Sequence, residues 1–300
     1  MRAQRPKRPW WKKKRFYLLA LFLGFYLYAY HFLGFRMTDA ELSRDLAQNE
    51  LGYRPEIGYR EIQGRRLRFV EIGADSLPLI VFIHGAPSSS SFWVSLMKNT
   101  SLLSQAKLLA VDRPGYGKSG YGLPELSVRK QAAMIAELIR QEKGGHPSVI
   151  LHGSSYGGTV AARLCMDYPD LIDGVLLQSA SLAPGQELIP WISRPSDSRW
   201  LRWLVPPSFR VATREKLSHR AELAKMLPYW GCIQAACIIL QGDSDGLIYP
   251  ENAVFARNHL PPGSVLDFRM VPGRGHDLLW TRNSLLVESL LKLVNISRKL

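Results

Sequence analysis

Ser155 is the residue around which the candidate chemistry of this chain gathers. It lies at the centre of Gly153-Ser154-Ser155-Tyr156-Gly157, a Gly-x-Ser-x-Gly pattern between an apolar run at 149–151 and a helical pattern from Thr159. In a strand, turn and helix of this kind, the serine is held in a strained backbone conformation with its hydroxyl exposed. The two glycines let the helix pack closely on the strand that it leaves. We therefore predict that Ser155 is a nucleophile.

A serine hydroxyl is a poor nucleophile at neutral pH, so it needs a base within hydrogen-bond reach and a carboxylate that orients this base. His276 and two aspartates, Asp243 and Asp245, each follow an apolar segment that predicts a buried strand. The carboxyl ends of parallel strands meet at one edge of a sheet, and active sites collect there. The sequence thus offers a nucleophile, an acid and a base in the chain order Ser, Asp, His, with either aspartate as the acid.

The elements that would position these residues alternate between strands and helices. Apolar runs and alternating segments predict strands at 59–63, 65–71, 79–83, 108–112, 149–151, 174–178, 237–241 and 265–271. Helical patterns and capping residues predict helices at 38–49, 127–142, 251–259 and 277–294, and others that begin within 88–91 and at about 159. This order predicts an α/β fold with a mostly parallel central sheet covered by helices on both faces. The first two strands would form an edge hairpin around Gly64.

The regular alternation breaks between residues 183 and 231. Prolines alternate there with aromatic residues, which predicts an inserted cap. The tryptophans of this segment either line an acyl pocket or bury the cap against the core. Its arginines favour anionic substrates or lipid headgroups, or they form a solvated basic face. We therefore divide the folded part into a core of residues 59–182 and 232–300 and a cap of residues 183–231.

The N-terminal segment predicts a transmembrane signal anchor. Residues 1–15 form a basic tail, and residues 16–35 carry no formal charge over a length that can span a bilayer. The positive charge before this span would place the tail in the cytoplasm and the catalytic domain on the opposite side, which is the periplasm in a bacterium. A cleaved signal peptide would end in a small-x-small site, and an amphipathic helix would have a polar face, and the segment has neither. Residues 36–58 would form a stalk.

Charge and composition argue against two classes of function. The net charge is +14, but eight basic residues and no acid lie within positions 2–15, so the rest of the chain is only mildly basic. Because no basic helix or aromatic-basic platform recurs later in the chain, we expect no nucleic-acid partner. No His or Cys spacing indicates a metal site, so we expect no metal and no cofactor. Of the three cysteines, Cys165 is expected to be buried, and the pairing of Cys232 with Cys237 stays open.

From about Tyr59 onward the chain resembles the α/β-hydrolase superfamily. The resemblance rests on five motifs in the family's order, which are His84-Gly85-Ala86-Pro87, Asp112-Arg113-Pro114-Gly115-Tyr116-Gly117-Lys118-Ser119, Gly153-Ser154-Ser155-Tyr156-Gly157-Gly158, Gly242-Asp243-Ser244-Asp245 and Gly275-His276. It implies that Ser155 is the nucleophile, His276 the general base and acid, and Asp245 the orienting carboxylate. Asp243 remains the alternative acid. The acid position that some relatives use after the strand at 174–178 is empty here until Glu187.

The same resemblance implies an oxyanion hole. Its donors would be the backbone N–H groups of Ala86 and Tyr156, because one follows the His-Gly pair and the other follows the nucleophile. His84 and Gly85 would support this loop rather than transfer protons. Many relatives carry a histidine immediately before the nucleophile, where this chain has Ser154.

The resemblance also narrows the reaction. Epoxide hydrolases and haloalkane dehalogenases share the His-Gly-x-Pro loop and a cap, but their nucleophile is a carboxylate, and this chain has Ser155 in that place. We therefore expect a membrane-anchored serine hydrolase that acts on an ester, thioester or related acyl bond through an acyl-enzyme intermediate. Its partner would be a small acyl substrate, apolar and lipid-like ones included. A carbon–carbon bond hydrolase, a cofactor-free peroxidase and a non-catalytic binding scaffold remain alternatives.

Overall fold

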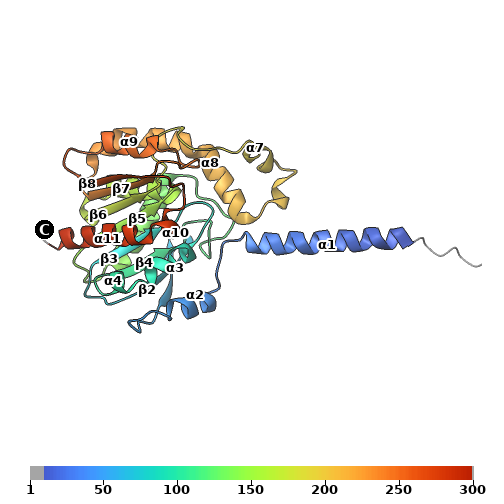
Figure 1. Ribbon diagram of the computed structural model, residues 1–300, viewed down its shortest axis with the longest axis horizontal. Coiled ribbons are helices and arrows are strands. Elements are labelled where there is room, and N and C mark those ends of the chain that lie inside the picture. The colour runs from blue at the N-terminus through green and yellow to red at the C-terminus, as the bar shows by residue number, and fades with distance from the viewer. Residues whose placement is uncertain (1–9, 299–300) are drawn as a thin grey trace, which may run out of the picture.

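The computed structural model describes residues 10–298, and within them eight strands form one sheet in the order β1-β2-β4-β3-β5-β6-β7-β8 (Figure 1). The strands are β1 Glu56–Ile62, β2 Arg65–Ile72, β3 Leu79–Ile83, β4 Lys107–Val111, β5 Val149–Ser154, β6 Gly174–Gln178, β7 Ala236–Gly242 and β8 Val265–Val271. β1 and β2 form the expected antiparallel hairpin, and β2 also runs antiparallel to β4. The pairs from β4 to β8 are parallel. The predicted fold class, a mostly parallel sheet, is confirmed.

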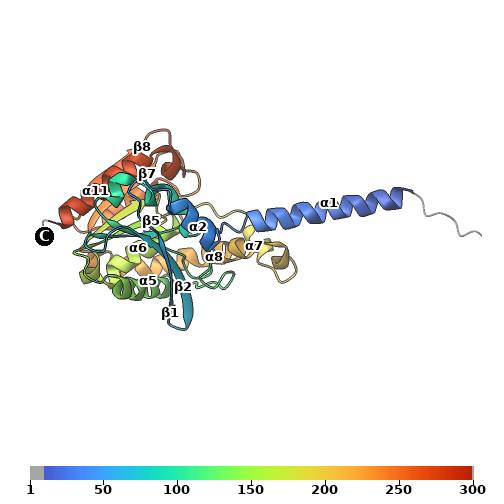
Figure 2. The ribbon, with the colours of Figure 1, turned by 90° about the horizontal axis from the view of Figure 1, so that it is seen from below.

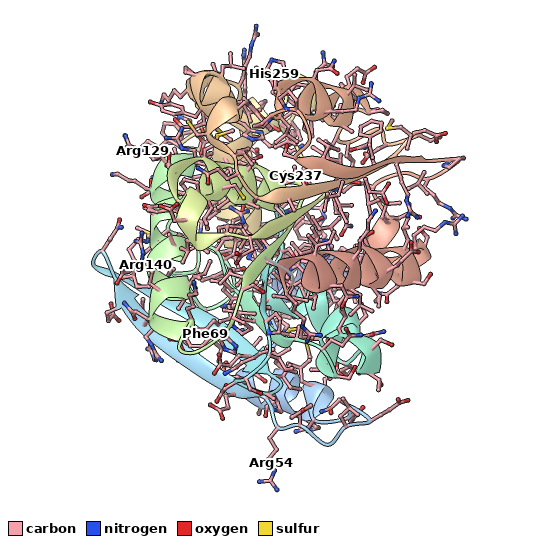
Figure 3. All side chains as sticks on the ribbon, turned by 90° about the vertical axis from the view of Figure 1, so that its left-hand side faces the viewer. Arg54, Phe69, Arg129, Arg140, Cys237 and His259 are labelled. Atoms are coloured by element: carbon pink, nitrogen blue, oxygen red, sulfur yellow. The ribbon has the colours of Figure 1, made fainter. Side chains whose placement is uncertain are left out.

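Alternate residues of the buried strands face two separate hydrophobic layers. In β3, Leu79, Val81 and Ile83 belong to one layer, and Ile80 and Phe82 belong to the other. The first layer is covered by α5 Val128–Glu142, α6 Tyr156–Asp167 and α9 Glu251–His259. The second is covered by α2 Asp39–Leu46, α3 Val94–Met97, α4 Thr100–Leu103 and α11 Asn283–Ser297. Figure 3 shows α5 on one side of the sheet and α11 on the other.

Two helices begin at the capping residues that the sequence indicates, and the last helix differs from its prediction. Thr38 and Glu41 form a complete capping box at the start of α2, and the Ser127 side chain caps α5. The final helix, predicted at 277–294, is instead divided into α10 Leu278–Thr281 and α11, because Arg282 leaves the helical conformation. The Asn283 side chain donates a hydrogen bond to the Leu279 carbonyl. This bond replaces the backbone hydrogen bond that a continuous helix would make to that carbonyl.

Residues 183–231, which we call the cap segment, combine an irregular stretch with a long helix that the sequence did not predict. The stretch to residue 206 holds only the short helix α7 Ser193–Ser196 and one 3-10 turn at 202–204. α8 then runs over Pro207–Met226, begins with a proline in its first turn, and contains no further proline. Trp191 and Trp200 are more than 80% exposed, so they neither line a pocket nor bury the cap. Trp230, in contrast, is buried.

The N-terminal helix α1 Trp10–Phe32 projects away from the sheet (Figures 1 and 2). Across residues 10–298 there is no helix with both the length and the hydropathy that crossing a membrane requires. The prediction of a transmembrane signal anchor at 16–35, with the catalytic domain on the far side of a membrane, is therefore wrong. The physical reason is that an uncharged segment need not be strongly apolar, because tyrosine, glycine and histidine are far less hydrophobic than leucine, and α1 contains Tyr17, Gly24, Tyr26, Tyr28, Tyr30 and His31. The first nine residues of the predicted basic tail lie outside the described residues.

Candidate active site

Ser155 sits on the sharp turn that the sequence predicted. β5 ends at Ser154, α6 begins at Tyr156, and Ser155 between them has a φ of 55° and a ψ of −126°. A non-glycine residue at positive φ is strained, and such strain persists only where the surroundings fix it. Here the Ser155 N–H donates to the Gln178 carbonyl of β6 at 3.1 Å, and the Ser155 carbonyl accepts from the N–H of Ser181 at 3.2 Å. The turn therefore holds the serine at the carboxyl edge of the sheet.

The glycines around the turn are required by close packing. A Cβ on Gly157 would lie 2.1 Å from the backbone oxygen of Ile83, and one on Gly153 would lie 2.7 Å from Gly157 O. These neighbours are backbone atoms, which cannot rotate away. The start of α6 consequently approaches both its own strand and β3, and only glycine fits at these two positions.

His276 pairs with Asp245 and not with Asp243. The His276 Nδ1 atom lies 2.8 Å from Asp245 Oδ2. The other carboxylate oxygen of Asp245 accepts the backbone N–H groups of Leu247 and Ile248 at 2.9 and 3.0 Å. Burial acts to raise the pKa of the Asp245 carboxyl, but the His276 ring and these N–H groups outweigh it and the net shift is downward. Asp245 is therefore an ionised, oriented partner for the imidazole, and Asp243 is exposed.

The predicted oxyanion loop lies against Ser155. A Cβ on Gly85 would lie 2.9 Å from Ser155 Cβ and 3.4 Å from Ser155 Oγ, so the absence of a side chain there allows the close approach. Ala86, the next residue, lines the same pocket as Ser155. Tyr156 is the first residue of α6, where backbone N–H groups are free and the helix dipole favours negative charge. Ala86 thus borders the pocket beside Ser155, and Tyr156 directly follows Ser155 in the chain.

His84 is a buried, neutral residue that shapes this loop. Its Nε2 atom accepts the Arg113 backbone N–H at 3.0 Å, so its Nδ1–H donates to the Gly85 carbonyl at 2.7 Å. Burial, together with the nearby Arg113 guanidinium, places the pKa of His84 well below its usual value. A neutral histidine whose two nitrogens are both engaged in hydrogen bonds suits the supporting role expected for it.

A network that the sequence did not reveal ties this loop to α8. The Arg113 guanidinium donates to the carbonyls of His84 and Gly85 at 2.8 and 3.2 Å, and it forms a two-pronged ion pair with Glu215 of α8 at 2.7 and 3.1 Å. Both side chains of the ion pair are fully buried. Burial alone would lower the pKa of Arg113, yet Glu215 raises it and the net shift is upward. Arg113 belongs to one of the motifs in the sequence, but no motif contains Glu215.

A second buried acid–histidine pair lies away from Ser155. Glu187 accepts from His219 Nδ1 at 2.8 Å, and His219 Nε2 lies 3.0 Å from Thr159 Oγ1 of α6. The hydrogen bond from His219 contributes to a lowered pKa for Glu187, although burial acts in the opposite direction. His219 is fully buried, so this pair fastens α8 to α6 and does not face a substrate.

A pocket of about 220 Å³ surrounds the candidate nucleophile. Ser155, His276 and Ala86 line it, together with aromatic side chains from separate parts of the chain. These aromatic residues are Phe35, Phe92 and Trp280. The sequence assigned none of the three to the site, because they lie outside the motifs. The pocket therefore brings a serine and a histidine together within a largely aromatic wall.

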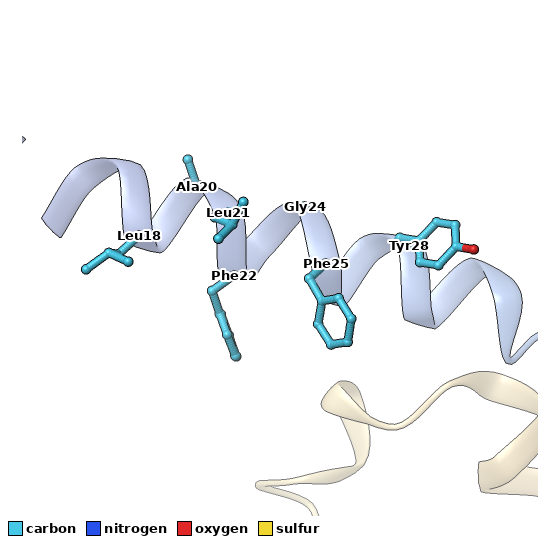
Figure 4. Close-up of a pocket in the computed structure, with 7 residues that line it drawn as sticks. All are labelled: Leu18, Ala20, Leu21, Phe22, Gly24, Phe25 and Tyr28. Carbon is cyan, nitrogen blue, oxygen red and sulfur yellow. The ribbon is translucent and has the colours of Figure 1, made fainter. Parts of the chain in front are cut away.

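A further hollow, of about 750 Å³, lies beside α1 (Figure 4). Residues of this one helix line it, among them Leu18, Phe22 and Tyr28. A single helix cannot enclose a ligand, so we assign no site to this hollow. Within residues 10–298 no group of three or more His, Cys, Asp and Glu side chains could hold a metal ion. The three cysteines are free, with Cys165 buried as expected, and Cys232 and Cys237 do not pair.

Comparison with known proteins identifies a family and several relatives. The sequence pattern of the alpha/beta hydrolase family matches residues 80–288. Epoxide hydrolase 1 from Caenorhabditis elegans is 27% identical over 171 residues, which are 53% of this chain and 40% of that protein. A multifunctional-autoprocessing repeats-in-toxin protein from Vibrio vulnificus is 35% identical over 95 residues, which are 31% of this chain and 2% of the toxin. The chain thus spans less than half the length of these curated relatives.

Solved structures with the same fold include two whose names indicate ester chemistry. A membrane phospholipase A, described as a bacterial virulence factor, has a TM-score of 0.64 and 19% identity, and the match covers 96% of this chain and all of that one. A putative aryl esterase from Burkholderia cenocepacia has a TM-score of 0.66 and 18% identity over 82% of this chain and all of that one. At these identities the likeness extends to the fold alone.

Proposed function

Because the chain belongs to the alpha/beta hydrolase family, we propose that it is a serine hydrolase that cleaves an ester, thioester or related acyl bond with Ser155, His276 and Asp245. The observation that carries the proposal is the 2.8 Å contact between His276 Nδ1 and Asp245 Oδ2, in a pocket that Ser155 also lines. This contact leaves Nε2 of His276 as the nitrogen that can take a proton from a serine hydroxyl.

The reaction follows from these roles. Ser155 Oγ attacks the carbonyl carbon of the substrate while His276 Nε2 takes the hydroxyl proton. The ionised Asp245 stabilises the imidazolium that forms. When the bond to the alcohol or thiol breaks, His276 gives the proton to this leaving group and an acyl-enzyme remains. Water then attacks the acyl-enzyme with His276 again as the base, so that one ester and one water yield one acid and one alcohol.

The negative charge on the carbonyl oxygen needs donors that are already in place. The N–H groups of Ala86 and Tyr156 are the candidates, supported by the close approach of Gly85 to Ser155 and by the position of Tyr156 at a helix start. Loss of one such donor typically lowers turnover by about 10²–10³-fold. The epoxide hydrolase among the relatives does not change this proposal, because the chain's own nucleophile position holds a serine and not a carboxylate.

We infer an apolar acyl substrate. The pocket beside Ser155 is walled largely by aromatic and other apolar groups, which favours a hydrocarbon part over a charged one. Two structurally similar proteins are named as a phospholipase and an aryl esterase, which agrees with an ester whose acyl or alcohol part is apolar.

The experiment that tests this function is covalent labelling of the purified full chain with a fluorophosphonate, followed by hydrolysis of p-nitrophenyl esters. We expect the wild type to be labelled on Ser155 and to hydrolyse esters, and Ser155→Ala and His276→Ala to lose both while remaining folded. Asp245→Asn should lower kcat by about 10⁴-fold. Asp243→Asn is the matched control, and it should stay close to the wild type. A folded wild type that is neither labelled nor active would refute the proposal.

A further inference from the structure

Residues Leu33–Arg36, which we call the N-terminal strap, connect α1 to α2 and reach the candidate active site. Phe35 from this strap lines the same pocket as Ser155 and His276. The sequence alone placed these residues at the end of an anchor and the start of a stalk, away from any chemistry. The match to the family pattern covers residues 80–288, so the strap lies outside the matched residues.

The strap is fastened to the start of α8. Ser208 Oγ donates to the Leu33 carbonyl at 2.9 Å. The rings of Phe35 and Phe209 lie 5.9 Å apart between centroids, at an interplanar angle of 48°. These two contacts join the strap to consecutive residues of α8, and α8 is in turn held to the core by the ion pair between Arg113 and Glu215. The position of Phe35 is therefore determined by tertiary contacts.

The backbone of Phe35 supports the same conclusion. Its φ is 48°, a strained conformation for a bulky residue, and such residues concentrate at functional sites. On the other side of the strap, the Arg36 guanidinium lies 3.9 Å from the centre of the Tyr121 ring. The strap is thus held on both sides of a strained phenylalanine whose ring borders the pocket.

The other aromatic residues of the pocket come from the core. The rings of Phe92 and Trp280 meet edge to face at 5.3 Å. Together with Phe35 they surround an opening of about 220 Å³ beside Ser155. Phe92 and Trp280 contact each other, whereas the Phe35 ring packs against Phe209 of α8. Phe35 is 40% exposed and lies outside both hydrophobic layers, so its size can change with little effect on the packing of the core.

We propose that Phe35 is a specificity-determining residue, which limits the length of the apolar chain that the pocket accepts. The inference deepens the proposed function and rests on Ser155 being the reacting residue. Each methylene group that a pocket buries raises kcat/KM about fourfold. For a series of esters with straight acyl chains, kcat/KM should therefore rise with length until the chain meets the Phe35 ring, and then fall.

The test measures kcat/KM for p-nitrophenyl esters from acetate to dodecanoate with the full chain. Phe35→Ala should move the maximum to longer chains and raise the ratio of long-chain to short-chain kcat/KM by tenfold or more. Phe35→Trp should move the maximum to shorter chains. A merely structural role would lower all rates together and could not produce opposite shifts. Phe22→Ala, an equal change at an exposed position of α1, is the matched control and should leave the profile unchanged.

A second measurement separates this inference from the proposed function. In Ser155→Ala, isothermal titration calorimetry with straight-chain carboxylates reports the preferred chain length without turnover, and Phe35→Ala added to this background should lengthen it. If no ester is hydrolysed but the preferred length in binding moves, the hydrolase proposal fails and the role of Phe35 stands. If the preferred length in binding stays unchanged in both Phe35→Ala and Phe35→Trp, the role of Phe35 is refuted. Phe35→Leu repeats the test with a smaller change if either variant does not fold.

Discussion

The ion pair between Arg113 and Glu215 allows a quantitative test of how α8 is joined to the oxyanion loop. The Glu215 carboxylate accepts hydrogen bonds from both terminal nitrogens of Arg113. It also accepts hydrogen bonds from the Tyr116 hydroxyl at 2.6 Å and the Gln131 amide at 2.9 Å. Neither charged side chain has any exposure to solvent. We predict that Glu215→Leu destabilises the protein strongly, because it leaves the buried guanidinium without a counter-charge.

The magnitude follows from the desolvated charge. Removal of one partner of a buried ion pair costs about 3–5 kcal/mol of unfolding free energy, because the remaining charge is buried without compensation. Replacement of both partners by apolar residues of similar volume is often neutral or stabilising. The double variant Arg113→Met with Glu215→Leu should therefore be more stable than either single variant. Its turnover should nevertheless stay low, because the methionine no longer donates to the carbonyls of His84 and Gly85.

Urea unfolding followed by both circular dichroism and tryptophan fluorescence measures these free energies, and coincident transitions would justify a two-state treatment. Lys225→Ala is the control on the same helix. Its side chain is 70% exposed and pairs with Glu222, so the change should cost less than about 1 kcal/mol. If Glu215→Leu costs as little as Lys225→Ala, or if the two single effects simply add in the double variant, the reasoning about this buried pair is wrong.

Two further predictions concern pH and packing. Burial lowers the pKa of His152 to about 3, against about 6.5 when unfolded, so stability present above pH 6.5 should be lost on acidification towards pH 3, by about 1.4 kcal/mol per pH unit between pH 6 and 4. Urea unfolding of His152→Gln at a series of pH values should show an unfolding free energy that depends less on pH than in the wild type, by that amount. An equal pH dependence in the two proteins would contradict this prediction. Gly157→Ala would press a Cβ against Ile83 O and should cost about 3 kcal/mol or more, whereas Gly231→Ala, with no atom within 4 Å, should be nearly neutral in thermal unfolding, and equal effects would disprove this packing argument.

The sequence predicted most of the elements because local patterns encode them. The continuous apolar run of β3 and the capping residues of α2 and α5 act over a few neighbouring positions, so they can be recognised in isolation. The sequence did not predict α8 for two reasons. Prolines and tryptophans before residue 207 indicate irregular structure, and the buried face of α8 includes the polar residues Glu215 and His219, so it lacks a clear apolar pattern. Those polar residues are buried only because partners in distant segments meet them.

The N-terminal prediction failed for a different reason. Residues 16–35 carry no charge, but their tyrosines, glycines and histidine make the segment less hydrophobic than a membrane-spanning helix requires. The same segment ends in the strap that supplies Phe35 to the pocket. A linear pattern cannot indicate such a contact, because it depends on where the segment lies after folding.

The sequence by itself predicted the candidate catalytic residues and their places at strand ends, since the turn around Ser155 and the order Ser, Asp, His can be recognised from neighbouring residues and chain order. The resemblance favoured Asp245 over Asp243, and the tertiary structure shows that Asp245 is the carboxylate in contact with His276. It also joined Arg113 to Glu215, residues about a hundred positions apart, and brought Phe35 to the pocket. Local sequence patterns determine the helices, strands and turns of the chain, and long-range packing determines which side chains contact each other.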